Sequence, residues 1–403
     1  MVNDMRDSIL WKIKRLLGFV RNFGHDPKLA SYNLAGYLLS KLPFFMQFRL
    51  KTFARQAGML SGIPTPPQDL VAEITNKFHV PATFVKLYRE QGHGPIDWSK
   101  SGWQDFFENL PPLQKITVPY AMSTVIRGRS MFSLLEGQSL IRKKNRYLDV
   151  GTGYGGFLRA AWEIGFKEVV GIELQPDLVE LARANVDGLQ GAQVLTDDFI
   201  KGDFSALGGF DLITCNDVIE HVDDPELAIQ KMSKLGNEDG CISFEVPNKD
   251  AISFVKSDGH FMIFGITQLP RHEAAEYHSA FTGAEKGYYL FEMGEMYELD
   301  WYSKKLLENG WSAFIADMHS IGDIENVPEL VADLKQAYQE WQTVTKPSLD
   351  NAIAERVTSS VEKYIENLEH DFSNLGDQAL EIQFKNKYLR TFWTIIATRE
   401  SPQ

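Results

Sequence analysis

The sequence predicts an α/β fold with a mainly parallel sheet of seven strands and helices on both faces. Apolar, strand-like runs alternate with helix-like stretches from Arg146 onward, and this alternation is typical of a parallel sheet covered on both sides. Hydrophobic residues make up 44% of the 403 residues, so the chain can bury a sizeable core. The length allows two domains, or one domain with large additions.

The order of the expected elements follows the apolar pattern. The strands are expected at 147–150, 168–172, 192–195, 210–215, 240–246, 312–319 and 391–399. Helices are expected between them at 156–164, 176–185, 225–235 and 301–310. Residues 320–385 are charged and helical in pattern, so they are predicted to form a helical insertion before the closing strand.

The N-terminal part differs from the rest in charge. Residues 1–55 contain ten Lys/Arg and three acids, whereas the whole chain has a net charge of −13. Residues 1–60 are predicted to form basic amphipathic helices, which can contact an anionic membrane surface peripherally or pack on the chain or on a second copy in a homodimer. Residues 61–142 begin in a Pro-rich connector and are predicted to form a helical cap or accessory region.

Composition excludes several classes of protein. The two cysteines, Cys215 and Cys241, are too few for a disulfide framework or a thiolate zinc site. No apolar run approaches the roughly 20 residues of a membrane helix, and the N-terminus has no signal-peptide pattern. These features favour a cytoplasmic location. The net negative charge argues against nucleic-acid binding by the surface as a whole.

A glycine turn joins the first expected strand to its helix. Such a turn lets a ligand approach the backbone closely, and the following helix N-terminus favours negative groups. The spacing has two interpretations. Gly151, Gly153 and Gly156 match the G-x-G-x-x-G of dinucleotide-binding proteins. Gly151, Gly153 and Gly155 match the G-x-G-x-G of methyltransferases.

Polar residues at four strand ends favour the second interpretation. Asp149 would repel a pyrophosphate but could bind an ammonium group. Glu173 can accept both hydroxyls of a ribose, and Asp198 with Phe199 could hold an adenine. Asn216 ends the fourth strand. Ligands of open α/β sheets bind outside these carboxyl ends.

Residues 146–248 resemble the core of class I S-adenosylmethionine-dependent methyltransferases, particularly the ubiquinone-biosynthesis O-methyltransferases. The matching stretches are LDVGTGYG, VVGIELQPDLVELAR, TDDF, FDLITCNDVIEHVDDP and EVPN. The resemblance implies a Rossmann-like domain over 143–319 and 386–403, with S-adenosylmethionine as cofactor. It also implies the cofactor-binding roles of the residues named above. Asp149, Gly151 and Gly153 would face the methionine part, Glu173 the ribose, Asp198 and Phe199 the adenine, and Asn216 the other side, with Gly155 as a further cofactor-binding residue of the glycine turn.

Methyl transfer to a hydroxyl requires an aligned acceptor and a group that removes its proton. Asp217, Glu220 and His221 resemble the E-x-x-E-H motif of ubiquinone-type and small-RNA 3′-end methyltransferases. There the motif can hold a divalent metal, so Mg²⁺ or another divalent ion is one expectation here. Asp217 replaces the first Glu and shortens its reach. The alternative is a Glu-His pair that caps the loop without metal.

His260 is the second candidate base, because it follows the fifth strand where the acceptor wall of this family lies. His272 and His278 are weaker candidates for the same role. The aromatic run over residues 288–301 either lines an acceptor pocket or belongs to the core.

The sequence therefore predicts an S-adenosylmethionine-dependent methyltransferase that O-methylates a small molecule or a glycan or lipid acceptor, with His260, His221 and Glu220 as catalytic residues. Three alternatives stay open. They are a nicotinamide-dependent oxidoreductase, a methyltransferase acting on RNA, and a non-catalytic scaffold that binds the cofactor.

Overall fold

The computed structural model describes residues 65–94, 96–319 and 321–399. The chain divides into two compact units, which are described separately. One comprises Gly128–Val179 and Gly188–Gln403, and the other comprises Met1–Arg127 and Glu180–Asp187. The basic helices expected over 1–60 lie outside the described residues. Within the described part of the chain, no helix has both the length and the apolar character needed to cross a membrane.

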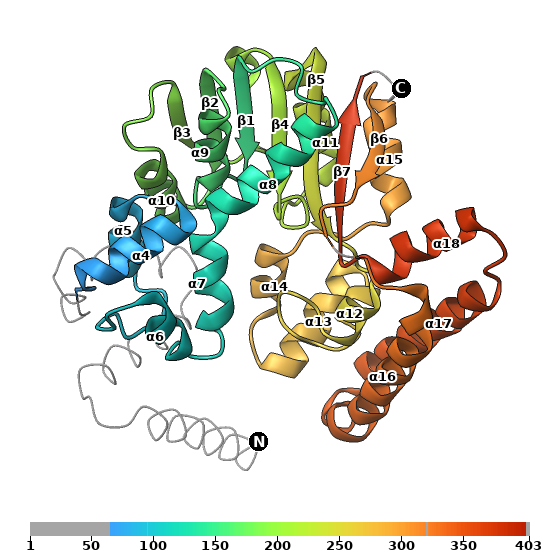
Figure 1. Cartoon of the computed structure of the whole chain (residues 1–403). Helices are drawn as coiled ribbons and strands as arrows, with labels where there is room; N and C mark the ends of the chain where they lie inside the picture. The colour runs from blue at the N-terminus through green and yellow to red at the C-terminus, as the bar shows by residue number, and fades with distance from the viewer. Residues whose placement is uncertain (1–64, 95, 320, 400–403) are drawn as a thin grey trace. The chain divides into compact units, whose positions relative to one another are not determined.

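Seven strands form one sheet in the order β3-β2-β1-β4-β5-β7-β6 (Figure 1). They are β1 (Arg146–Val150), β2 (Glu168–Glu173), β3 (Ala192–Thr196), β4 (Phe210–Asn216), β5 (Gly236–Pro247), β6 (Ser312–Ala316) and β7 (Phe392–Thr398). β1 to β5 pair in parallel, whereas β7 runs antiparallel to both β5 and β6. The predicted mainly parallel seven-stranded sheet is confirmed.

Helices precede and connect the parallel strands. They are α4 (Gln68–Phe78), α5 (Ala82–Gln91), α6 (Trp103–Glu108), α7 (Gln114–Met122), α8 (Thr124–Gly137), α9 (Gly156–Glu163), α10 (Pro176–Val186), η1 (Ser205–Leu207) and α11 (Pro225–Leu235). α11 shows why the local sequence folds this way. Asp224 caps it by accepting from the Leu227 N–H at 2.9 Å, and Pro225 occupies its first turn.

A second group of helices follows β5. It comprises α12 (Ile252–Lys256), η2 (Ile266–Gln268), α13 (Arg271–Thr282), α14 (Lys286–Glu292) and α15 (Leu299–Glu308). The predicted helical insertion lies between β6 and β7. It comprises η3 (Ile324–Asn326), α16 (Val327–Glu340), η4 (Trp341–Thr345), η5 (Lys346–Ser348), α17 (Asn351–Ser373), α18 (Gln378–Phe384) and η6 (Lys385–Leu389).

Alternate residues of the central strands face opposite sides of the sheet, as the period of a strand requires. Leu148 and Val150 of β1 face a core that α11 and α15 cover. Tyr147 and Asp149 face the other side, where the Tyr147 ring contacts Phe132 of α8 at 5.4 Å, edge to face. Both faces are therefore covered, which explains the nearly continuous apolar runs of these strands.

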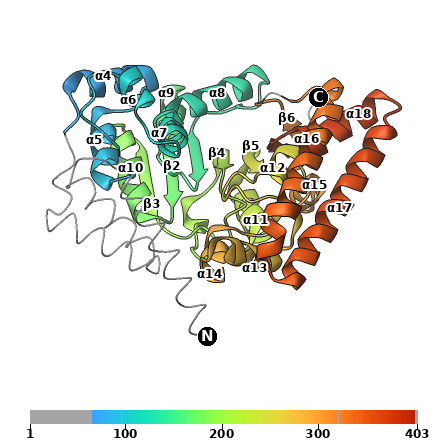
Figure 2. The ribbon, with the colours of Figure 1, turned by 90° about the horizontal axis from the view of Figure 1, so that it is seen from below.

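A separate core joins the insertion to the segment after β5. Its buried residues come from α12, η2, α13 and α14 and from the insertion helices α16, α17 and α18. Figures 1 and 2 show α16 and α17 lying side by side. The Tyr338 hydroxyl of α16 donates to the Glu362 carboxylate of α17 at 2.8 Å. The insertion is thus packed against the chain that follows β5.

The other unit holds a small aromatic core. Tyr88, Trp98 and Phe106 are buried there, and the Trp98 and Phe106 rings lie 4.9 Å apart. Glu73 of α4 accepts from the Trp103 N–H at 2.6 Å and so satisfies the start of α6. The domain boundaries expected from the sequence stay predictions.

Candidate active site

The glycine turn after β1 has the backbone conformation that its sequence demands. Gly151, Gly153 and Gly155 all have positive φ, at 67°, 53° and 74°. The Gly151 N–H donates to the Ile172 carbonyl at 2.8 Å, which ties the turn to β2. A Cβ at Gly151 would lie 2.3 Å from Val218, whereas one at Gly153 would contact nothing closer than 3.9 Å. Gly151 is therefore required by packing, and Gly153 leaves open space above the turn.

Asp149 lies buried beneath this turn. Its Oδ2 accepts from the Thr152 hydroxyl at 2.8 Å, and its Oδ1 accepts from the Thr214 hydroxyl at 2.6 Å. Burial raises the pKa of Asp149 to about 6, although both hydrogen bonds act in the opposite direction. The carboxyl group thus links the turn to β4, a role that the sequence did not indicate because Thr214 lies 65 residues away.

Glu173 ends β2 with its carboxyl group against the same turn. Its Oε2 accepts from the Gly153 N–H at 2.9 Å, and its Oε1 accepts from the Gln175 N–H at 2.8 Å. Burial raises the pKa of Glu173, and these backbone donors oppose the shift. The side chain is therefore fixed at the edge of the sheet where the sequence places the ribose site.

Asp198 and Phe199 follow β3 in a tightly held loop. The Phe199 ring is buried and stacks on Phe204 at 5.5 Å. The Lys231 ammonium of α11 donates to the Phe199 carbonyl at 2.9 Å and so holds the loop against this helix. Burial tends to raise the pKa of Asp198, but the contacts of its carboxylate with Lys201 and the loop N–H groups outweigh this and lower it. Lys231 is a residue that sequence reasoning missed.

Asn216 lies at the end of β4, on the same edge of the sheet. Its side-chain oxygen and nitrogen are both buried, and neither has a hydrogen-bond partner among the described residues. A buried amide without partners is costly, at about 1–3 kcal/mol, and native proteins rarely keep one without a use. Asn216 is therefore poised to bind a polar ligand.

Glu220, His221 and His260 form a cluster just beyond β4. One carboxylate oxygen and one nitrogen of each imidazole lie within 4.8 Å of one another. The structure thus brings Glu220 and His221 together with His260 rather than with Asp217, which has a positive φ of 53° and is not in this cluster. The His221 Nδ1 pairs with the backbone carbonyl oxygen of Glu292, which directs its Nε2 toward Glu220 at 3.8 Å.

The electrostatics of this cluster favour neutral groups. Burial, with the nearby Asp217 carboxylate, raises the pKa of Glu220 well above its usual value, and Glu220 Oε2 has no partner among the described residues. Desolvation by the surrounding protein and the neighbouring His221 both lower the pKa of His260, so its imidazole is neutral at pH 7. His260 is an exposed residue by its solvent-accessible surface, and solvent moderates this shift.

A small pocket of mainly apolar character opens beside His260. Its lining residues are Pro247, Phe254, Asp258, Gly259, His260, Ile266, Thr267, Tyr289, Met293 and Met296. The predicted aromatic run therefore has two fates. Tyr289, Met293 and Met296 line the pocket, whereas Tyr297 and Trp301 stack at 3.8 Å against the sheet core.

Asp258 holds the loop that presents His260. Its carboxylate accepts from three backbone N–H groups, those of His260 at 3.0 Å, Phe261 at 2.8 Å and Ile263 at 2.7 Å. Met262 in this loop has a positive φ of 57°. Sequence reasoning missed Asp258, although an Asp-Gly pair before a candidate base is a turn signal.

The other two histidines lie away from the pocket. His278 is buried, with its ring 4.5 Å from the Phe261 ring, and does not line the pocket. The His272 side chain is 77% exposed and lies 3.9 Å from the Glu273 carboxylate. Arg271 has a structural role, because it pairs with Asp223 at 2.7 Å and so ties α13 to the loop after β4.

Comparisons with known proteins identify similar methyltransferases. A family model described as a methyltransferase domain covers residues 126–321. Curated relatives are ubiquinone biosynthesis O-methyltransferases. The one from Actinobacillus pleuropneumoniae is 32% identical over 109 residues, which is 26% of this chain and 46% of the relative. The one from Vibrio atlanticus is 28% identical over 173 residues, 42% of this chain and 65% of the relative. For several of these relatives, including the one from Actinobacillus pleuropneumoniae, the chain spans only about half of the relative's length.

Similar solved structures include an S-adenosylmethionine-dependent methyltransferase from Clostridium acetobutylicum. It is 20% identical, covers 32% of this chain and 53% of that one, and has a TM-score of 0.28. An amino pentose methyltransferase from Micromonospora echinaspora is 21% identical, and the match covers 34% of this chain and 57% of that one, with a TM-score of 0.27. The family match, the ordered motifs of 146–248 and the strand order lead to one conclusion. This chain carries a methyltransferase domain of the class I, S-adenosylmethionine-dependent type.

Proposed function

We propose that this chain transfers the methyl group of S-adenosylmethionine to a hydroxyl oxygen of a small molecule or of a glycan or lipid intermediate. The observation that carries the proposal is the position of His260. It lines a mainly apolar pocket and also belongs to the cluster with Glu220 and His221. An acceptor hydroxyl can be held in such a place while a neighbouring group takes its proton. The names of the curated relatives favour oxygen as the acceptor atom.

The residues at the strand ends fit the cofactor. Gly153 leaves the space above the turn open, Glu173 offers a fixed carboxyl group, and Asn216 offers an amide without partners among the described residues. Asp149 keeps the turn in place from below. When bound, the cofactor supplies an electrophilic methyl group on a sulfonium sulfur. The chain's own part is to orient the acceptor and to receive its proton.

His260 is the residue that we assign as general base. Its imidazole is neutral at pH 7, so one ring nitrogen can accept a proton from a hydroxyl in the pocket. His221 and Glu220 lie beside it. The Asp217 carboxylate would favour the imidazolium that forms, because it acts to raise the pKa of His260. Asp258 keeps the His260 backbone in place through its three N–H contacts.

A metal-assisted form of the same reaction is favoured by one specific observation. Glu220 Oε2 is buried without a partner among the described residues, and it belongs to a set of one carboxylate and two imidazoles. Mixed nitrogen and oxygen donors of this kind suit Zn²⁺ or Mn²⁺ better than Mg²⁺. Glu220, His221 and His260 would hold the ion, which would polarise the acceptor oxygen.

The proposal is tested with the purified full-length protein, methyl-labelled S-adenosylmethionine, and panels of phenols, sugars and lipid extracts. We expect label in an acceptor. His260→Ala should lower turnover about 100-fold with the affinity for S-adenosylmethionine unchanged. His272→Ala is the matched control and should leave turnover unchanged, because His272 lies outside the pocket. Cofactor binding without transfer to any acceptor would point to a scaffold, and binding of NADH instead would point to an oxidoreductase.

Chelation separates the two forms of the reaction. If a divalent ion takes part, dialysis against a chelator should abolish turnover, and Mn²⁺ or Zn²⁺ should restore it. Turnover that survives chelation would assign the proton transfer to His260 alone.

A further inference from the structure

We propose that Asn248 and Tyr364 are positioning residues that hold the wall of the acceptor pocket on the helical insertion, so that the insertion determines which acceptors fit. This inference rests on the proposed function, because it takes the pocket beside His260 as the acceptor site. The part of the wall concerned consists of two segments, the end of β5 with residues 248–250 and the turn at 265–268, which includes η2; Pro247, Ile266 and Thr267 are its lining residues.

The first segment is clamped by Asn248. This residue follows the lining residue Pro247 and is fully buried. Its Nδ2 lies within hydrogen-bond distance of three carbonyl oxygens at the end of the insertion, those of Asn386, Lys387 and Arg390, at 3.2, 2.9 and 2.7 Å. Its Oδ1 accepts from the Asp250 N–H at 3.0 Å. Both ends of the amide are used, so the path of the chain after β5 is set by η6 and the residue that follows it.

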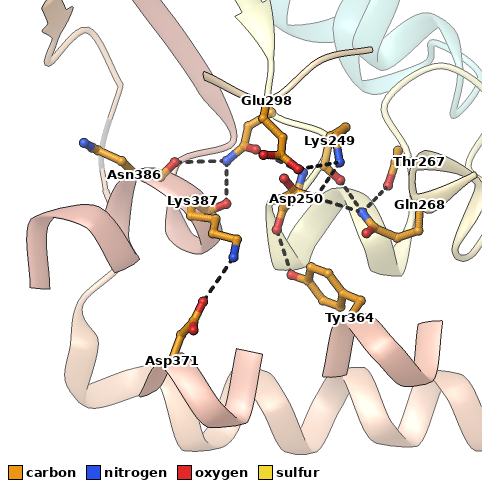
Figure 3. Close-up of polar contacts among 10 residues, drawn as sticks. Lys249, Asp250, Thr267, Gln268, Glu298, Tyr364, Asp371, Asn386 and Lys387 are labelled. Carbon is orange, nitrogen blue, oxygen red and sulfur yellow. Dashed lines mark hydrogen bonds and ion pairs between the residues drawn. The ribbon is translucent and has the colours of Figure 1, made fainter. Parts of the chain in front are cut away.

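Tyr364 makes the second connection. It lies on α17 and is 5% exposed, and its hydroxyl donates to the Asp250 backbone carbonyl at 2.7 Å. Figure 3 shows the Tyr364 hydroxyl pointing to Asp250, with the Gln268 amide next to Lys249 and Asp250. The Gln268 amide donates to the Lys249 carbonyl at 2.8 Å. Tyr364 of α17 therefore holds residues 249–250, and these hold Gln268. Gln268 is the neighbour of Thr267, and Thr267 lines the pocket.

The second segment of the wall rests directly on α17. Gly265 has a φ of +71°, and a Cβ there would lie 2.8 Å from Val361. Glycine therefore permits both the turn and the close approach to the helix. The next residue, Ile266, lines the pocket. Each segment of the wall is consequently held by the insertion at a point within one or two residues of a lining side chain.

The insertion contributes no lining residue among residues 321–391 of the described chain. Its effect on the pocket therefore passes through the wall, which is why Asn248 and Tyr364 are positioning rather than catalytic residues. Packed interiors transmit small displacements, so a wall that is released from the insertion would change the shape of so small a pocket. Acceptor fit would change, while the cofactor residues at the ends of β1 to β4 would not.

Hydrogen–deuterium exchange of the full-length protein tests the coupling without any acceptor. In Tyr364→Phe we expect amide exchange in residues 247–268 to rise about fivefold, the effect of losing one hydrogen bond. Tyr338→Phe is the matched control, since it also removes a tyrosine hydroxyl that bridges two parts of the insertion region, here α16 and α17. It should leave 247–268 unchanged. Unaltered exchange there in Tyr364→Phe would overturn the inference, and this variant decides even if Asn248→Ala fails to fold.

Kinetics with a phenol acceptor give the second readout. Tyr364→Phe should raise the KM for the phenol about fivefold, with kcat and the Kd for S-adenosylmethionine unchanged. Equal losses of cofactor binding and turnover would show a general structural role and overturn the inference. If the wild-type protein methylates no phenol, the same measurement is made with the sugar and lipid panels. Failure with every acceptor would count against the proposed function alone, and the exchange experiment would still decide whether the insertion holds the wall.

Discussion

The charge state of Asp149 makes a prediction at the scale of one residue. Its pKa is about 6 in the folded protein because it is buried, against an ordinary value of 3.8. The folded state therefore favours the protonated carboxyl group, and the stability from this group is present below about pH 4 and lost as the pH rises through about 6. Between pH 4 and 7.5 the wild type should lose about 2 kcal/mol of unfolding free energy relative to Asp149→Asn.

Urea unfolding of both proteins across this pH range measures the difference. Thr214→Val provides a second check, because the Thr214 hydrogen bond lowers the pKa of Asp149. Its removal should move the loss of stability to higher pH. Parallel stability curves for the wild type and Asp149→Asn would contradict the prediction.

Side chains of the site were predictable from the sequence where their positions depend on local structure. Asp149, Glu173 and Asn216 end strands that short apolar runs define, and parallel strands bring such ends to one edge of a sheet. The position of His260 does not depend on local structure in this way. Its ring lies 5.0 Å from that of His221, although the two residues are 39 positions apart in the sequence, because Asp258 holds the loop that carries His260. The sequence indicated both histidines but no contact between them.

The glycine turn gives a prediction at the scale of the element that joins β1 to α9. Alanine at either Gly151 or Gly153 would have to adopt a positive φ, and this backbone strain would lower the stability of the folded protein by about 1 kcal/mol. Gly151→Ala would also overlap Val218, so we expect a total loss of about 2–4 kcal/mol of stability. Gly153→Ala should cost only the strain, yet lower the affinity for S-adenosylmethionine at least tenfold, because its Cβ projects into the open space above the turn.

Thermal unfolding and titration calorimetry of the two variants separate these effects. The outcome that would contradict this account is a Gly153→Ala protein that binds the cofactor as tightly as the wild type. A Gly151→Ala protein as stable as the wild type would show that Val218 moves aside freely.

The extents of five strands were predicted within one residue at each end, and β5 and β6 are the exceptions. β4 and α11 match their expected ranges within one residue. β6 was expected to run to His319 but ends at Ala316, and the His319 imidazole pairs with the Glu245 carboxylate at 2.6 Å. β5 begins at Gly236 rather than 240, and an irregularity in its pairing with β4 hides this start from an apolar pattern.

At the scale of the whole molecule, the sequence predicted the layers but not which helices share a core. The mainly parallel sheet and the Rossmann-like domain followed from the alternation of elements and from the resemblance, whereas the packing of the insertion against the segment after β5 depends on contacts across more than a hundred residues. Tyr364 and Asp250 are 114 residues apart. An amphipathic pattern shows that a helix has a partner, but it does not identify that partner.

The molecule has two hydrophobic cores made of different residues, so we expect mutations in them to have different effects. Leu334 of α16 is fully buried in the core that joins the insertion to the pocket wall. Leu334→Ala should destabilise that core by about 2–5 kcal/mol. Amide exchange should then rise over 252–290 and 327–389, with little change in β1 to β4 and less than a twofold change in the Kd for S-adenosylmethionine. Ile229→Ala on α11 is the matched variant in the sheet core, and it should raise exchange in the strands instead. If Leu334→Ala loosened both regions equally, the two cores would unfold as one cooperative unit, and the insertion would support the cofactor site as much as the acceptor pocket.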